Sequence, residues 1–301
     1  MKVLVLGGTY FLGRAFVEMA AGEHQLTLVN RGNNPLSLPG ITEYSMDRHD
    51  GEKLGELHGM KFDAVVDFCA YEKGDISFFL EKSGILTGQY LFVSTCDVYR
   101  RDLKTQIKED APFETRQFPG QEGAYISGKV ALEQELQEVG AGYGFPVTSF
   151  RPVFIYGPGN YAPRESVYFR WILQAGQILH PTDATGSFQM VYVKDVASAI
   201  LLSLGNQTTY DRAYNLCAPG RLNYESFREM LTEVVETPFE QVDVTVDTVL
   251  ERQIPLPFPL REEESLWYDG SAVEELGLKY TDLLSGMRET YAAFLNTPEA
   301  V

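Results

Sequence analysis

The first residues of the chain limit its fold more than any other segment. The apolar run Val3–Leu6 has the composition of a buried β-strand and leads directly into Gly7-Gly8-Thr9-Tyr10-Phe11-Leu12-Gly13. Apolar residues then recur at helical spacing over Phe11–Ala21. Small residues let a backbone approach phosphate groups, and the N-terminus of a helix offers unpaired N–H groups to an anion. The pattern predicts a βαβ unit in which all seven residues of the loop Gly7–Gly13 contact a dinucleotide.

One position departs from the usual glycine pattern of such loops. Tyr10 stands between Gly7 and Gly13, where a middle glycine is normal. A tyrosine side chain at this position must either point away from the dinucleotide or cover it. We expect the approach of the backbone to the pyrophosphate to be altered without loss of binding.

Strand-like and helix-like segments alternate through the first half of the chain. The predicted strands are Lys2–Leu6, Gln25–Asn30, Ile41–Ser45, Asp63–Cys69, Gln89–Ser94 and Pro146–Phe150, and the predicted helices are Phe11–Ala21, Ile76–Ser83 and Tyr125–Val139. Repeated strand–helix units imply a parallel sheet that is covered by helices on both faces. The expected fold is therefore α/β, a Rossmann-type doubly wound parallel sheet.

The second half of the chain changes character. Gly157–Asn160 and Pro163 interrupt the alternation, and the three prolines of Pro255–Pro259 exclude a helix or an inner strand. Further predicted elements are a strand running into a helix over Val191–Leu204, a strand over Ala213–Leu216 and a helix over Asn223–Glu236. We expect residues 1–155 and 185–218 to form the dinucleotide-binding domain, and residues 156–184 and 219–301 to form a smaller substrate-binding lobe.

Charge and composition argue against several classes of function. The chain carries 25 Lys+Arg against 42 Asp+Glu, a net charge of −17, whereas a general nucleic-acid binder needs a basic face. No apolar segment reaches the roughly 18 residues of a membrane helix, and the N-terminus does not fit a signal peptide. The three cysteines form no CxxC pair and the four histidines show no ligand spacing, so we expect no metal site. A cytoplasmic protein with reduced thiols is expected.

Two residues at the end of the second predicted strand bear on the choice of cofactor. A carboxylate at this position binds the ribose hydroxyls of NAD, but this chain has Asn30 and Arg31. Asn30 can bond a ribose hydroxyl without repelling a phosphate, and Arg31 can pair with the 2′-phosphate of NADP. The sequence therefore favours NADP modestly over NAD, with a solvated Arg31 as the alternative.

Three residues form a predicted catalytic group. Tyr125 and Lys129 lie four residues apart on one helix face, and Thr95 follows the strand Gln89–Ser94 at the sheet edge where ligands bind. A free tyrosine has a pKa of about 10, and a nearby ammonium lowers this pKa. We expect Tyr125 to exchange the substrate's hydroxyl proton while hydride moves to or from a nicotinamide. Lys129 would lower the pKa of Tyr125 and bind the nicotinamide ribose, and Thr95 would donate to the substrate oxygen.

With these motifs the chain resembles the extended short-chain dehydrogenases/reductases of the NAD-dependent epimerase/dehydratase family. The matching segments are Gly7–Gly13, Ser94–Tyr99, Tyr125–Lys129, Arg151–Pro158, Val191–Ala197, Tyr214–Leu216 and Glu275–Gly277. The resemblance implies a C-terminal lobe that binds a small-molecule substrate, often a nucleotide sugar, and a homodimer formed through helices that include Tyr125–Val139. It implies that Thr95, Tyr125 and Lys129 are catalytic and that Asp47 contacts adenine. Cys69 and Ala70 are further candidates for cofactor contacts.

The departures from the family pattern concern the substrate. Sugar-nucleotide 4,6-dehydratases carry an Asp-Glu pair after the catalytic threonine, where this chain has Cys96 and Asp97, so dehydration is not expected. Many relatives have an asparagine at the position of Phe154, and an arginine that grips a diphosphate at the position of Phe188 and Gln189. Phe154 and Phe188 either make the pocket more apolar or pack in the core.

Other charged residues have less specific interpretations. Arg164, Arg170, Lys194 and Arg221 are candidates to replace the missing arginine, although a solvated charge is the commoner role. Glu133 and Glu135 are expected on a solvated face of their helix.

These features and the resemblance predict an NAD(P)-dependent oxidoreductase or epimerase that acts at a carbinol or keto carbon of a sugar or nucleotide sugar. An NADP-dependent reductase of a non-sugar carbonyl is an alternative, and a tightly held cofactor would favour the epimerase. The loop Gly7–Gly13 and the later Asn-Arg-Gly also resemble atypical members, including plant chloroplast relatives that bind RNA. A regulatory or RNA-associated protein is thus a further alternative, which the −17 charge and the three catalytic candidates oppose.

Overall fold

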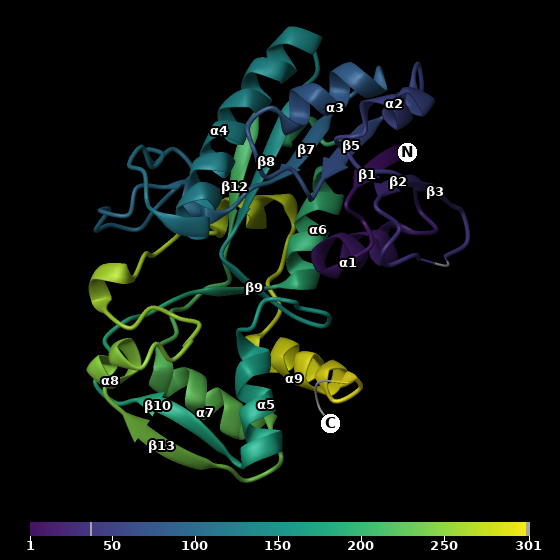
Figure 1. The fold of residues 1–301 in the computed structure, drawn as a ribbon. Helices are drawn as coiled ribbons and strands as arrows, with labels where there is room; N and C mark the ends of the chain where they lie inside the picture. Colours follow the sequence, from purple (N-terminus) through teal and green to yellow (C-terminus); the bar gives the residue numbers. More distant parts are fainter. Residues whose placement is uncertain (37, 299–301) are drawn as a thin grey trace.

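The computed structural model describes residues 1–36 and 38–298, and its centre is a seven-stranded parallel sheet (Figure 1). The strand order is β12-β8-β7-β5-β1-β2-β3. These strands are β1 (Lys2–Leu6), β2 (Gln25–Asn30), β3 (Ile41–Ser45), β5 (Ala64–Asp67), β7 (Tyr90–Val93), β8 (Val147–Pro152) and β12 (Arg212–Leu216). The order reverses direction between β1 and β5, which is where open α/β sheets bind ligands. The predicted Rossmann-type fold class is confirmed.

Helices cover both faces of this sheet (Figure 1). One face carries α1 (Phe11–Ala20) and α6 (Val193–Ser203), and the other carries α2 (Gly51–Leu54), α3 (Asp75–Ser83) and α4 (Gly120–Tyr143). Successive strand residues point to opposite faces. Val3 and Val5 accordingly pack in the cluster of α1 and α6, whereas Leu4 and Leu6 pack in the cluster of α3 and α4. Burial on both faces explains why the central strands are apolar throughout.

The remaining elements form a smaller group below the sheet in Figure 1. A parallel pair, β10 (Gln177–Pro181) and β13 (Glu240–Val244), lies among α5 (Glu165–Ala175), α7 (Tyr224–Val234), α8 (Val246–Glu251) and α9 (Leu283–Phe294). A second parallel pair, β9 (Phe154–Tyr156) and β11 (Met190–Tyr192), lies between this group and the sheet. One hydrophobic cluster joins side chains of α1, α6, β11, α7 and α9. The domain boundaries expected from the sequence stay a prediction.

Short elements complete the described chain. These are the pair β4 (Lys61–Phe62) and β6 (Leu86–Thr87), and the 3₁₀ turns η1 (Gly55–Leu57), η2 (Cys96–Val98), η3 (Gln207–Thr209), η4 (Glu262–Glu264) and η5 (Ser271–Leu276). In the part of the chain that the structure describes, no helix has the length and apolar character needed to cross a membrane.

Helix α4 differs most from its prediction. It begins at Gly120 rather than Tyr125, and the expectation that Glu133 and Glu135 are solvated is wrong. Glu133 is only 3% exposed, and Glu135 accepts hydrogen bonds from the backbone of Gly74 and Ser77 at 2.5 and 2.7 Å. The reason is that α4 packs against both β8 and α3, so more than one side of the helix is covered.

Candidate active site

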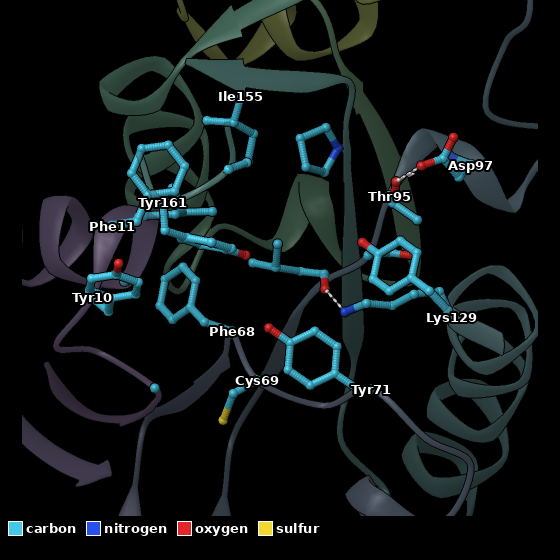
Figure 2. A pocket seen from close by; sticks show the side chains of 18 of the residues that line it. Tyr10, Phe11, Phe68, Cys69, Tyr71, Thr95, Asp97, Lys129, Ile155 and Tyr161 are labelled. Carbon is cyan, nitrogen blue, oxygen red and sulfur yellow. Dashed lines mark hydrogen bonds between the residues drawn. The ribbon is translucent and has the colours of Figure 1, made fainter. Parts of the chain in front are cut away.

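A cavity of about 790 Å³ opens at the carboxyl ends of the central strands. Its wall is formed by the loop after β1, the end of β2, the segments after β5 and β7, the start of α4, and the residues around β9 and η4. Figure 2 shows part of this lining. A volume of this size suits a cofactor-sized ligand in a preformed site.

The glycine loop forms one end of the cavity. A Cβ on Gly13 would lie 2.1 Å from the Gly7 carbonyl oxygen, so only glycine lets the loop turn this tightly into α1. Gly7, Thr9, Tyr10, Phe11, Leu12 and Gly13 line the cavity. Gly8 does not line the cavity. A Cβ on Gly8 would lie 2.8 Å from the Val5 side chain, so a glycine is needed here for packing against the core.

The start of α1 is suited to an anion. Its N-cap residue Tyr10 makes no side-chain capping hydrogen bond, and its first turn holds no acidic residue. The first N–H groups of a helix have no partner within the helix and carry partial positive charge. Together with the close backbone at Gly7 and Gly13, these features fit the pyrophosphate of a dinucleotide.

Tyr10 turns towards a loop from the smaller group of elements (Figure 2). Its ring stacks on Tyr161 with centroids 5.3 Å apart, and the Phe11 ring meets Tyr161 edge-on at 5.9 Å. We call Tyr10, Phe11 and Tyr161 the aromatic bridge. Tyr161 lies between β9 and α5, after Gly157 and Gly159, whose φ angles of 143° and 79° allow the loop to turn back over the cavity. The bridge thus forms part of the cavity wall beside the glycine loop.

The residues at the end of β2 lie at a second end of the cavity. Asn30 is buried; its Oδ1 accepts from the Gly32 N–H at 2.7 Å, and its Nδ2 donates to Glu43 at 3.0 Å. Arg31 is exposed and lines the cavity, as does Asp47. Glu43 has no counterpart among the predicted site residues, because nothing in the sequence shows that β3 places it beside Asn30.

Arg48 is a further lining residue that the sequence did not indicate. Its guanidinium is buried and donates to both carboxylate oxygens of Asp67, at 3.0 and 3.1 Å. Asp67 in turn accepts from the Cys69 N–H at 2.9 Å. The pair therefore fixes the chain after β5, where Cys69 lines the cavity. In the sequence, Arg48 stands within the polar run Asp47–Asp50, which is typical of a solvated loop.

The three catalytic candidates lie in the same cavity. Lys129 is 2% exposed, and its Nζ donates to the carbonyls of Ala70 and Val93, each at 2.8 Å. Its Nζ is 5.9 Å from the centre of the Tyr125 ring. The Thr95 hydroxyl donates to Asp97 at 3.1 Å (Figure 2).

The electrostatics of Tyr125 differ from the expectation. Burial raises the pKa of Tyr125, Asp97 raises it further, and the Thr95 hydroxyl acts in the opposite direction. Burial lowers the pKa of Lys129 to about 8. In the ligand-free protein the phenol of Tyr125 thus holds its proton firmly, instead of being acidified by Lys129.

The far end of the cavity is aromatic. Phe188 is buried and stacks on Phe258 at 3.8 Å, and Phe154 lies 6.2 Å from Phe188; both Phe154 and Phe188 also line the cavity. Gln189 is fully engaged, since its amide donates to and accepts from the backbone of Tyr268 at 3.2 and 2.8 Å.

The arginine and lysine candidates separate in the structure. Lys194 pairs with Glu289 and Arg221 with Glu262, and both lie outside the lining. Arg170 lies within α5 and does not line the cavity either. Arg164 lines the cavity.

Cys96 does not provide an acid. It is buried, and its thiol donates to the Arg151 carbonyl at 2.9 Å. Burial raises the pKa of Cys96 well above its usual range, and Cys217 adds to the effect. Of the two positions at which 4,6-dehydratases are expected to carry Asp and Glu, the first therefore holds no acid in this chain, whereas the second holds Asp97.

Comparison with known proteins agrees with this architecture. Residues 79–217 match the NAD dependent epimerase/dehydratase family. The UDP-glucose 4-epimerase of Thermotoga maritima superposes with a TM-score of 0.77 at 20% identity, covering 98% of each chain. The dTDP-glucose 4,6-dehydratase of Streptomyces venezuelae, solved with NAD bound, has a TM-score of 0.75 at 20% identity, covering 98% of this chain and 97% of its own. These likenesses establish a shared fold.

A curated relative comes from Arabidopsis thaliana. It is the chloroplast stem-loop binding protein of 41 kDa b, which is 27% identical over 308 residues, covering 96% of this chain and 78% of its own length. The resemblance predicted from the motifs is confirmed over residues 79–217, which match the NAD dependent epimerase/dehydratase family.

Proposed function

We propose that the protein is an NAD(P)-dependent oxidoreductase that acts at a carbinol or keto carbon of a small-molecule substrate. One observation carries this proposal: a continuous cavity joins the glycine loop before α1 to Thr95, Tyr125 and Lys129. A bound nicotinamide would accept or supply the hydride. The match of residues 79–217 to the NAD dependent epimerase/dehydratase family supports the same class of reaction.

Three side chains of the site would transfer the proton, bind the cofactor and bind the substrate oxygen. Because its pKa is raised, Tyr125 is protonated at neutral pH, and its phenol therefore carries the proton that a keto oxygen would receive on reduction. Lys129 uses two of its three N–H donors on the carbonyls of Ala70 and Val93, which leaves one donor for a ribose hydroxyl. Thr95 must exchange its bond to Asp97 for one to the substrate oxygen.

The first prediction concerns the cofactor. We expect both NAD and NADP to bind, with NADP preferred, because Arg31 lies in the cavity wall and the end of β2 carries the neutral Asn30 instead of a carboxylate. Arg31→Ala should weaken NADP binding about ten-fold and leave NAD binding unchanged, since a charge-assisted hydrogen bond contributes about 1.5–3 kcal/mol. Calorimetric titration of both dinucleotides measures this.

A matched control for that experiment is Arg288→Ala, which removes an exposed arginine outside the cavity lining. Glu43, whose carboxylate accepts from Asn30 Nδ2 at 3.0 Å, is the acidic side chain that would oppose a 2′-phosphate. A strong preference of the wild type for NAD would show that Glu43 outweighs Arg31. Failure of both dinucleotides to bind would refute the oxidoreductase proposal itself.

The aromatic bridge favours an epimerase over a reductase. A cofactor retained beneath Tyr10 and Tyr161 is oxidised and reduced within one turnover, whereas a reductase must exchange it every cycle. An aromatic pair contributes about 0.5–1.5 kcal/mol. Tyr161→Ala should therefore release bound reduced dinucleotide roughly two- to ten-fold faster, as measured by stopped-flow fluorescence with excess ADP-ribose as competitor.

Tyr143→Ala is the control for this release experiment, because Tyr143 is 56% exposed at the end of α4 and contacts Phe145 outside the cavity lining. Equal release rates for Tyr161→Ala and Tyr143→Ala would contradict a role of the bridge in cofactor retention.

Nucleic-acid binding is a second candidate function, favoured by the name of the Arabidopsis relative. The net charge of −17 opposes it. Titration with stem-loop RNA at physiological salt decides between the two candidates. Tight binding that is unchanged in Tyr125→Phe would favour the nucleic-acid function.

A further inference from the structure

Among the described residues, Arg164 is a partly buried cation of the cavity wall that pairs with no acidic side chain. Its guanidinium is partly buried, lies 4.8 Å from the centre of the Phe154 ring, and donates from Nη1 to the Ile155 carbonyl at 3.3 Å. Within residues 1–36 and 38–298 it forms no ion pair. The neighbouring Glu165 is directed to Asn160, which donates to its two oxygens at 2.9 and 3.1 Å.

The other lining cations at this end are already satisfied. Arg48 pairs with Asp67 at 3.0 Å, and Arg101 donates to Glu122 at 3.0 Å and approaches Asp97 at 3.4 Å. Lys129 is held by two carbonyls. Arg164 is therefore the lining cation near Tyr125 that keeps most of its five donors for a ligand.

The partial burial of Arg164 makes its unpaired positive charge energetically unfavourable. Burial lowers the pKa of Arg164 below its ordinary value, and Glu165, Asp97, Tyr161 and Tyr125 compensate only in part. A partly desolvated charge without a partner destabilises a protein, and an incoming anion removes that penalty. The Phe154 ring supports one face of the planar guanidinium, which leaves its edge for two parallel hydrogen bonds.

We propose that Arg164 binds an acidic group of the substrate, a carboxylate or a phosphate, so that the substrate is an anionic carbinol or ketone. This inference rests on the proposed function. The anion would be gripped from the N-terminal end of α5, and not from the segment of Phe188 and Gln189, whose side chains are committed to Phe258 and Tyr268.

The test uses pairs of compounds that share their carbinols and differ in charge: glucose 1-phosphate with glucose, and glucuronate with its methyl ester, plus UDP-glucose as a third phosphate source. Wild type loaded with oxidised dinucleotide should show at least ten-fold higher kcat/KM for a charged member of a pair. Arg164→Gln should lower kcat/KM for that member about ten- to hundred-fold and leave the neutral member unchanged. Arg164→Lys should retain part of the effect, since it keeps the charge without the planar fork.

The pair of compounds whose difference in kcat/KM is lost in Arg164→Gln shows whether the acidic group is a phosphate or a carboxylate. Arg288→Gln is the control for loss of a positive charge. Equal losses for neutral and charged members, or no preference in the wild type, would overturn the inference.

A second measurement separates this inference from the proposed function. If no compound reduces the dinucleotide, thermal unfolding of wild type and Arg164→Gln is compared with the same compounds. If the charged compounds raise the unfolding temperature of the wild type but not that of Arg164→Gln, the anion site is supported although the oxidoreductase proposal fails. Absence of such stabilisation overturns both.

Discussion

Replacement of Tyr125 by phenylalanine is expected to lower turnover about 10²–10⁴-fold, the usual contribution of a positioned proton donor. The substitution removes only the phenol hydroxyl. The ring contact with Tyr71 at 6.5 Å and the two hydrogen bonds that hold Lys129 remain. The Kd for the dinucleotide should therefore change by less than about two-fold. Steady-state kinetics and calorimetric titration of the same preparations check both expectations.

Tyr71→Phe is the matched comparison, because it removes a hydroxyl from a second tyrosine at the same site. The Lys129 Nζ lies 4.9 Å from the centre of the Tyr71 ring, closer than its 5.9 Å to that of Tyr125. Of these two tyrosines, Tyr125 is the one for which a hydrogen bond with the Thr95 hydroxyl opposes the rise in pKa that burial causes. The loss in Tyr71→Phe should therefore be much the smaller of the two. A larger loss there would transfer the role of proton donor to Tyr71.

The second large effect is expected on stability. Glu133 and Arg151 form a buried ion pair, with the Nε and Nη2 of Arg151 donating at 2.8 and 3.1 Å. Arg151 also donates to the hydroxyl of Tyr99 at 2.7 Å and to the Glu109 carbonyl at 2.9 Å. Glu133→Ala leaves the arginine buried without its partner, which costs about 3–5 kcal/mol. Urea unfolding should show a lower midpoint with an unchanged slope.

The control for this stability experiment is Asp102→Ala, which breaks the exposed pair with Arg100 and should leave the midpoint nearly unchanged. Burial alone would raise the pKa of Glu133, but Arg151 outweighs it and holds this pKa below its ordinary value. The contribution of the pair is therefore present at neutral pH and is lost as pH falls through the folded pKa. A midpoint in Glu133→Ala equal to that of the control would contradict this role.

The sequence predicted the sheet well because its strands carry local signals. The bounds of β1, β2 and β3 agree with the predicted ranges, since each strand is an apolar or alternating run that ends at glycine or polar residues. The start of α4 was missed because Gly120 to Ala124 has no apolar periodicity. The burial of Glu133 and Glu135 was missed for a related reason: their partners come from β8 and α3.

The site shows the same division between local and distant signals. Thr95, Tyr125 and Lys129 share one cavity, as expected from a strand end and an i, i+4 spacing. The contact between Tyr10 and Tyr161, and the unanswered charge of Arg164, depend on how the loop between β9 and α5 folds back over the sheet. No local pattern in either segment encodes that contact. The homodimer through α4 stays a prediction.

A single-turnover experiment tests the central claim most directly. Protein loaded with oxidised dinucleotide is mixed with the charged carbinols named above, and the absorbance of reduced nicotinamide is followed over time. Hydride transfer in the wild type, slowed about 10²–10⁴-fold in Tyr125→Phe at equal dinucleotide occupancy, is the predicted result. The contradicting result is no reduction by any carbinol in a protein that binds stem-loop RNA tightly at physiological salt.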